Sequence, residues 1–193
     1  MTRSFPREWA NYEYKDAKAI LLGLRKIQRS LPLAGLDYKI ASLRTRQLRP
    51  YLEGRQAALF CYGMGQVLGT GVSFAQVEAE DHDIVTRRMV GNEYIYTPVQ
   101  LEEWVPNCIR EQSSLQEELD KLKKYVDAQE LVVAFHMNRD ARVTLQSLRL
   151  PVGSIRELWL FGAANPDQST WHLLGNLLSP DARAHEFSYP AAA

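Results

Sequence analysis

The stretch VSFAQVEAEDHDIVTRRMVGNEYIYTPVQLEEW, residues 72–104, carries the pattern that decides the fold. It contains three runs that are rich in β-branched and aromatic residues, the types that are enriched in strands. The runs are 72–79, 83–90 and 93–104. An acidic turn, Glu80-Asp81-His82, separates the first two runs, and Gly91-Asn92 is a hairpin signal before the third. The pattern therefore predicts three strands in a meander.

Helical patterns flank the meander on both sides. Apolar residues at helical spacing predict a helix at 13–30 and a second from about Leu52 to Leu68, which ends in a glycine-rich cap. Downstream, Ser113-Ser114 with Glu117 is an N-capping signature for a helix over 113–127. The apolar runs 131–138 and 156–164 are typical of buried strands. The predicted class is α/β.

Composition limits the class of protein further. The chain has 193 residues, of which 46% are apolar and 24% charged, as expected for one compact globular domain. No apolar stretch approaches the ~18 residues of a membrane span, and the N-terminus lacks the apolar core of a signal peptide. The two cysteines, Cys61 and Cys108, form no CxxC pair, so we expect both to be buried free thiols. We expect a soluble, cytoplasmic protein without a membrane partner.

Charge is unevenly distributed along the chain, although its formal net value is zero. Residues 1–55 contain twelve Lys and Arg but five Asp and Glu, so this segment has an excess of seven positive charges. Such a segment suits contact with an anionic polymer, whereas an alternative is a set of solvated helix faces. We therefore expect nucleic acid as a partner. The basic residues predicted to contact it are Lys15, Lys18, Arg25, Arg44, Arg46, Arg49 and Arg55.

The order helix, three strands, helix, strand resembles the αβββαβ core of the restriction-endonuclease-like, or PD-(D/E)XK, nucleases. That family has an Asp near the start of the second strand and a Glu/Gln-x-Lys pair on the third. Here Asp83 and the pair Gln100-x-Glu102 match those positions. The resemblance implies a basic helical extension at 1–51 and a nuclease-like core at 52–190 within one compact domain.

The resemblance also implies a metal-dependent phosphodiester hydrolysis site. Period-2 alternation puts Gln100 and Glu102 on one face of their strand. Asp83, Glu102 and Asp81 would hold Mg²⁺ or Mn²⁺, because hard oxygen ligands suit these ions. In many members a further Glu comes from the preceding helix, and Glu53 is the candidate here, with Glu78 as its rival. The predicted catalytic set is Asp83, Gln100, Glu102 and Glu53.

One departure from the family pattern leaves alternatives open. Glu102 stands where the family usually has its catalytic Lys, so a nuclease fold whose site has decayed, used to bind nucleic acid or protein, is the main alternative. A third hypothesis is a nucleotidyltransferase-like protein, because Asp81-x-Asp83 resembles the paired metal-binding acids of that class. Those proteins carry an adjacent Gly-Ser on a helix, whereas this chain has Gly71-Val72-Ser73.

Overall fold

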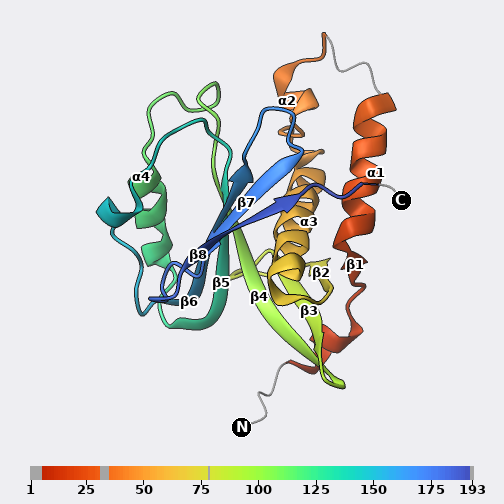
Figure 1. Cartoon of the computed structure of the whole chain (residues 1–193), viewed down its shortest axis with the longest axis vertical. Coiled ribbons are helices and arrows are strands. Elements are labelled where there is room, and N and C mark those ends of the chain that lie inside the picture. Colours follow the sequence, from red (N-terminus) through yellow and green to blue (C-terminus); the bar gives the residue numbers. More distant parts are fainter. Residues whose placement is uncertain (1–5, 31–34, 78, 192–193) are drawn as a thin grey trace. The chain divides into compact units, whose positions relative to one another are not determined.

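The structure is a computed structural model that describes residues 6–30, 35–77 and 79–191 (Figure 1). The chain divides into two compact units, each built from separate stretches of sequence. Unit 1 comprises Met1–Val77, Ile84–Tyr96 and Tyr189–Ala193, and unit 2 comprises Glu78–Asp83 and Thr97–Ser188. The division into 1–51 and 52–190 expected from the sequence stays a prediction.

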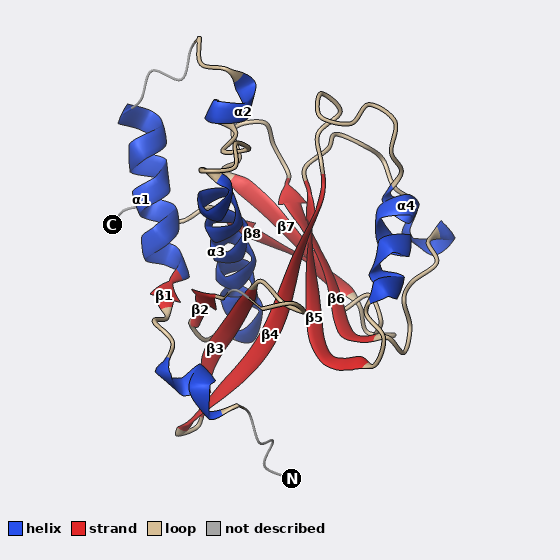
Figure 2. Ribbon diagram, turned by 180° about the vertical axis from the view of Figure 1, so that it is seen from behind, coloured by secondary structure: helices blue, strands red, loops and turns tan. Residues whose placement is uncertain are grey.

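Unit 1 packs helices against a small antiparallel sheet. Its strands follow one another in the order β1-β2-β3-β4, with β1 antiparallel to β2 and β2 antiparallel to β3. Helices α1 and α3 lie side by side, and α3 packs on β2 (Figures 1 and 2). The elements are the 3₁₀ helix Arg7–Asn11, β1 (Lys15–Asp16), α1 (Ala17–Ser30), α2 (Tyr38–Ala41), α3 (Arg49–Leu68), β2 (Val72–Gln76), β3 (Ile84–Val90) and the first residues of β4 (Glu93–Trp104).

The longest helix, α3, has clear sequence signals at both ends. Pro50 lies in its first turn, where the N–H that proline lacks has no partner within the helix. The helix ends at Gly69, which adopts φ 64° and ψ 22°, a left-handed conformation that suits glycine. Between these ends the helix buries small and apolar side chains, among them Ala57, Leu59 and Phe60. This buried stripe holds α3 in the core of unit 1.

Unit 2 contains a mixed sheet in the order β4-β5-β6-β7-β8 (Figure 2). Strands β4, β5 and β6 are parallel, and β7 and β8 are added antiparallel. Parallel strands need a crossover connection, and the one from β4 to β5 contains a short helix. The elements are the remainder of β4, α4 (Leu115–Asp120), a 3₁₀ helix at Lys121–Lys124, β5 (Ala128–Met137), a 3₁₀ helix at Leu145–Ser147, β6 (Ile155–Ala163), β7 (Thr170–Gly175) and β8 (Arg183–Ser188).

The core of unit 2 lies between α4 and one face of this sheet. Ser114 caps α4: its hydroxyl accepts the Glu117 N–H, while the Glu117 carboxylate accepts the Ser114 N–H at 2.8 Å. The helix then packs its leucines on alternate strand residues, which share one face because side chains alternate along a strand. The cluster consists of Trp104, Leu115, Leu119, Leu122, Leu131, Val133, Phe135, Ile155, Leu158 and Leu160.

The structure confirms the α/β class and the strands within residues 72–104 and corrects several details. The helix predicted over 113–127 is shorter, because α4 ends at Asp120 and a 3₁₀ turn follows to Lys124. Beyond the elements expected from the sequence, β8 joins the sheet at Arg183–Ser188, and the Tyr189 hydroxyl that follows it donates to the Leu21 carbonyl at 2.8 Å. Cys61 is buried as expected, but Cys108 is exposed.

Candidate functional site

Asp83 and Gln100 meet at the point where β4 enters unit 2. The Gln100 Nε2 donates to Asp83 Oδ2 at 2.6 Å, and the Leu101 N–H donates to the same oxygen at 2.9 Å. The Asp83 N–H in turn donates to the Val99 carbonyl at 3.2 Å. The carboxylate is therefore fixed against β4 by two N–H donors, although 17 residues separate Asp83 from Gln100.

Glu102 lies two residues farther along β4 and shares the strand face of Gln100. Its Oε1 accepts hydrogen bonds from Lys124 Nζ at 3.0 Å and from the Tyr125 hydroxyl at 3.1 Å. The Lys124 ammonium also lies 4.7 Å from the centre of the Tyr125 ring. These partners come from the segment that follows α4. One face of β4 thus carries an amide bound to Asp83 and a carboxylate paired with a lysine.

Two pKa shifts fix the protonation of this group. Burial lowers the pKa of Lys124, but hydrogen bonds to Tyr125 and Glu102 outweigh that effect and leave the pKa above its ordinary value. Burial raises the pKa of Tyr125 to about 12, and the Glu102 charge adds to the rise. At neutral pH Lys124 is therefore a cation and Tyr125 a neutral hydrogen-bond donor.

Asp83, Gln100 and Glu102 carry the donor atoms that a divalent ion at this place would use. Two carboxylates and one side-chain amide offer hard oxygen ligands of the kind that Mg²⁺ takes. Gln100 now directs its nitrogen at Asp83, so an ion beside Asp83 requires the amide to turn its oxygen inward. Within the described residues, no group of three or more His, Cys, Asp or Glu side chains could hold a metal ion. The oxygen donors are therefore of the type that fits a divalent ion. Binding of the ion requires the Gln100 amide to change its orientation.

The other predicted acidic residues have different surroundings. Asp81 and Asp83 lie in the bend before β3. Asp81 contacts His82 Nδ1 at 2.7 Å, and its side chain is 78% exposed. Glu53 belongs to unit 1, where it pairs with Arg49 at 2.8 Å, whereas Asp83, Gln100 and Glu102 belong to unit 2. Its rival Glu78 lies outside the described residues.

The seven predicted basic contacts do not form one uniform surface. Lys15 donates to Gln76 at 3.0 Å and Arg25 stacks over the Tyr189 ring at 4.1 Å, so both are engaged within unit 1. Arg49 pairs with Glu53 but remains exposed. Lys18 and Arg46 are exposed, while Arg44 and Arg55 are partly buried.

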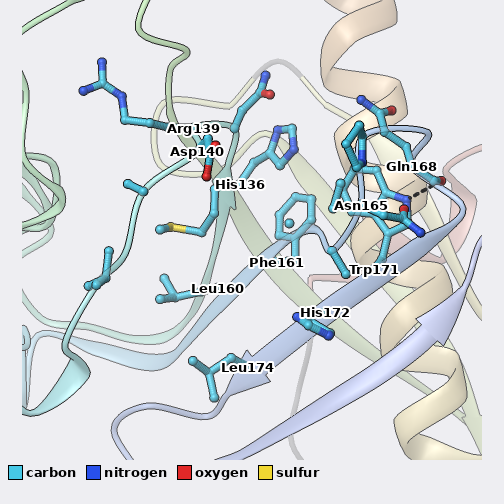
Figure 3. Close-up of a pocket in the computed structure, with 18 of the residues that line it drawn as sticks. His136, Arg139, Asp140, Leu160, Phe161, Asn165, Gln168, Trp171, His172 and Leu174 are labelled. Atoms are coloured by element: carbon cyan, nitrogen blue, oxygen red, sulfur yellow. Dashed lines mark hydrogen bonds between the residues drawn. The ribbon is translucent and has the colours of Figure 1, made fainter.

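A cavity of about 790 Å³ lies in unit 2 at the carboxyl ends of β5 and β6 (Figure 3). The His136 ring stacks on the Phe161 ring with a centroid distance of 4.9 Å. The centroid of the Trp171 ring lies 5.8 Å from that of His136. Beside them, Asn138 Nδ2 donates to Glu103 Oε1 at 2.7 Å. Ligands of parallel sheets often bind at this edge. No local pattern of the sequence predicts this group of rings, because His136, Phe161 and Trp171 come from three separate strands, β5, β6 and β7.

Comparison of the chain with protein-family models, with curated proteins and with solved structures finds no match. Among the helices within the described residues, none is both long enough and apolar enough to span a membrane.

Proposed function

We propose that this protein is a metal-dependent nuclease of the restriction-endonuclease-like type. Its site, formed by Asp83, Gln100 and Glu102, hydrolyses phosphodiester bonds of a nucleic acid. The observation that carries the proposal is the pairing of Glu102 with Lys124 on the face of β4 where Gln100 holds Asp83. The family resemblance lacks its usual lysine at position 102. Lys124 supplies an ammonium beside that position from a different element, so the departure in sequence leaves a cation at the site.

Each residue then has a role that its chemistry allows. Asp83, Glu102 and the oxygen of a turned Gln100 amide would hold Mg²⁺ or Mn²⁺, which when bound lowers the pKa of a water and stabilises charge on a phosphate. Lys124 remains protonated because its pKa is raised, so it binds a phosphate oxygen and does not serve as a base. The Tyr125 hydroxyl donates a hydrogen bond to Glu102 and orients that carboxylate.

The test is hydrolysis of labelled DNA and RNA with Mg²⁺ or Mn²⁺, together with the rise in melting temperature that each ion produces. Asp83→Ala should lower the rate by at least about 100-fold and remove the ion-dependent stabilisation. Lys124→Ala should lower the rate but keep that stabilisation. Lys123→Ala is the matched control, because Lys123 pairs with Asp120 at 2.9 Å instead of Glu102. A wild-type protein without hydrolysis and without an ion-dependent shift would contradict the proposal.

A second candidate is a nuclease-like fold that binds nucleic acid without cleaving it. It is favoured by the way that N–H and O–H donors of the protein already satisfy oxygens of both carboxylates: Gln100 and Leu101 donate to Asp83, and Lys124 and Tyr125 donate to Glu102. In this arrangement the protein's own donors satisfy these oxygens without a metal ion. Binding of nucleic acid that divalent ions do not change, with no cleavage, would select this candidate.

A further inference from the structure

An arginine lies between tyrosine rings on the sheet of unit 1. The guanidinium carbon of Arg87 lies 4.2 Å from the centre of the Tyr14 ring and 4.6 Å from that of Tyr94. Tyr96 completes the group, with ring centroids 6.0 Å from Tyr14 and 6.4 Å from Tyr94. We call Tyr14, Arg87, Tyr94 and Tyr96 the tyrosine–arginine platform. It joins residues that lie 73 positions apart in sequence, and all four belong to unit 1.

The strand register puts this platform on the sheet face opposite α3. Gln76 faces α3, since a Cβ on Gly54 would lie 3.3 Å from the Gln76 side chain. Alternation along β2 then turns Ser73 away from α3, and Ser73 pairs with Arg87 across the strands. Arg87 therefore lies on the face that α3 does not cover.

The platform has the features of a binding surface. Tyr94 is 47% exposed, so a large part of its ring faces solvent. The Nε of Arg87 is buried without a hydrogen-bond partner, so the flanking Tyr14 and Tyr94 rings are what interacts with the positive charge on this side of the guanidinium. Burial raises the pKa of Tyr14 far above its ordinary value, although the Arg87 charge acts in the opposite direction, so the ring beside the arginine stays neutral.

Charge and ring chemistry identify the class of ligand. Unit 1 contains fourteen Lys and Arg against six Asp and Glu, an excess of eight positive charges that favours a polyanion. Exposed aromatic rings beside an arginine are the means by which proteins bind unpaired bases, because every base has a face that stacks. The bases of a duplex are already stacked on one another, so they cannot use such a ring without unstacking.

We propose that the tyrosine–arginine platform of unit 1 binds single-stranded nucleic acid, with a base stacked on Tyr94 and a phosphate beside Arg87. The inference rests on the proposed function in one respect, since both require a nucleic-acid ligand. Beyond that function, the platform favours a single-stranded ligand and provides a stacking surface, which the basic residues of the helices do not supply.

The test is fluorescence anisotropy of labelled dT12 and rU12 with the full chain, in EDTA and at low salt, against a duplex of equal length. Both single strands should bind more tightly than the duplex. Tyr94→Ala should weaken binding by about 10-fold, which corresponds to ~1.4 kcal/mol for one lost stack. Tyr94→Phe should bind within about twofold of the wild type, because it keeps the ring. Arg87→Gln should reduce the slope of log K against log salt by about 0.7.

Tyr38→Ala is the matched control, because Tyr38 is 45% exposed and lies in α2. Equal losses from Tyr38→Ala and Tyr94→Ala, an unchanged affinity for Tyr94→Ala, or a preference for duplex would each overturn the proposal. EDTA separates this outcome from the proposed hydrolysis. Binding by the platform without cleavage in Mg²⁺ contradicts only the nuclease, and cleavage by a Tyr94→Ala variant that binds like wild type contradicts only the platform.

Discussion

The two units have opposite charge. Unit 1 carries an excess of eight positive charges, whereas unit 2 contains nine Lys and Arg against seventeen Asp and Glu, an excess of eight negative charges. The neutral total of the chain hides this difference. A basic unit attracts a polyanion, and an acidic unit supplies carboxylates that can hold a cation. The two properties that the proposed nuclease would require, a basic segment and acidic side chains, are thus separated between different parts of the chain.

The hydrophobic cores of the two units consist of different residues, so a substitution in one core should destabilise that unit most. Phe135 of β5 is 1% exposed and belongs to the cluster under α4, while Phe74 of β2 is fully buried in unit 1. Phe135→Ala should lower the free energy of unfolding of unit 2 by about 3–5 kcal/mol, because it removes a buried ring and leaves a cavity. Hydrogen exchange read on peptides of β5 and β6 measures this loss.

Phe74→Ala is the matched variant for unit 1. Its exchange should increase in peptides of β2 and α3 by a similar free energy. An equal increase over all peptides in both variants would show that the units unfold as one, and the distinction between two cores would then carry no energetic meaning.

Helix capping gives a smaller effect that again distinguishes the units. α4 has six residues and begins with the reciprocal bonds of Ser114 and Glu117, whereas α3 has twenty residues and no side-chain cap at Leu48. A short helix depends more on its cap, since isolated helices of this length are unstable. Ser114→Ala should cost about 1 kcal/mol, and Ser114→Asp should restore most of it. Urea unfolding measures both, and an unchanged midpoint for Ser114→Ala would contradict the prediction.

Local patterns predicted much of this fold, and contacts between distant residues account for what they missed. Alternation and β-branched residues within 72–104 located the strands, and Ser114 with Glu117 located the start of α4. The predicted end of this helix was wrong: α4 ends at Asp120, a 3₁₀ turn follows to Lys124, and Asp127 adopts a positive φ of 55° just before β5. The bond from Tyr189 to Leu21 spans 168 residues, so no local pattern could predict it.

In the candidate site, too, local patterns predicted what lies along one strand, and contacts between distant residues were missed. Spacing along β4 correctly put Gln100 and Glu102 on one face, and Asp83 does reach Gln100. The partners of Glu102 were not predicted, because the sequence pattern put Lys124 and Tyr125 in the last turn of a helix over 113–127. In the structure, both side chains instead donate hydrogen bonds to Glu102. The family resemblance assigned Glu53 to the same site; the structure shows its pairing with Arg49 in unit 1, and its place in the site stays a prediction.

The smallest expected effect is at alkaline pH, where two half-buried tyrosines are compared, Tyr125 in unit 2 and Tyr14 in unit 1. Burial raises the pKa of both, that of Tyr125 to about 12. An unfolded chain ionises tyrosine near pH 10, so the contribution of Tyr125 to stability is complete below that pH and is lost as pH rises toward 12. Because Tyr125 is partly exposed, screening limits this contribution to roughly 1 kcal/mol or less. Tyr125→Phe should therefore make the fall in stability between pH 10 and 12 shallower. Ultraviolet titration should also lose one tyrosine that ionises near pH 12, whereas Tyr14→Phe should leave that component in place. A Tyr125→Phe titration identical to wild type would show that Glu102 and its partners do not hold this hydroxyl in solution.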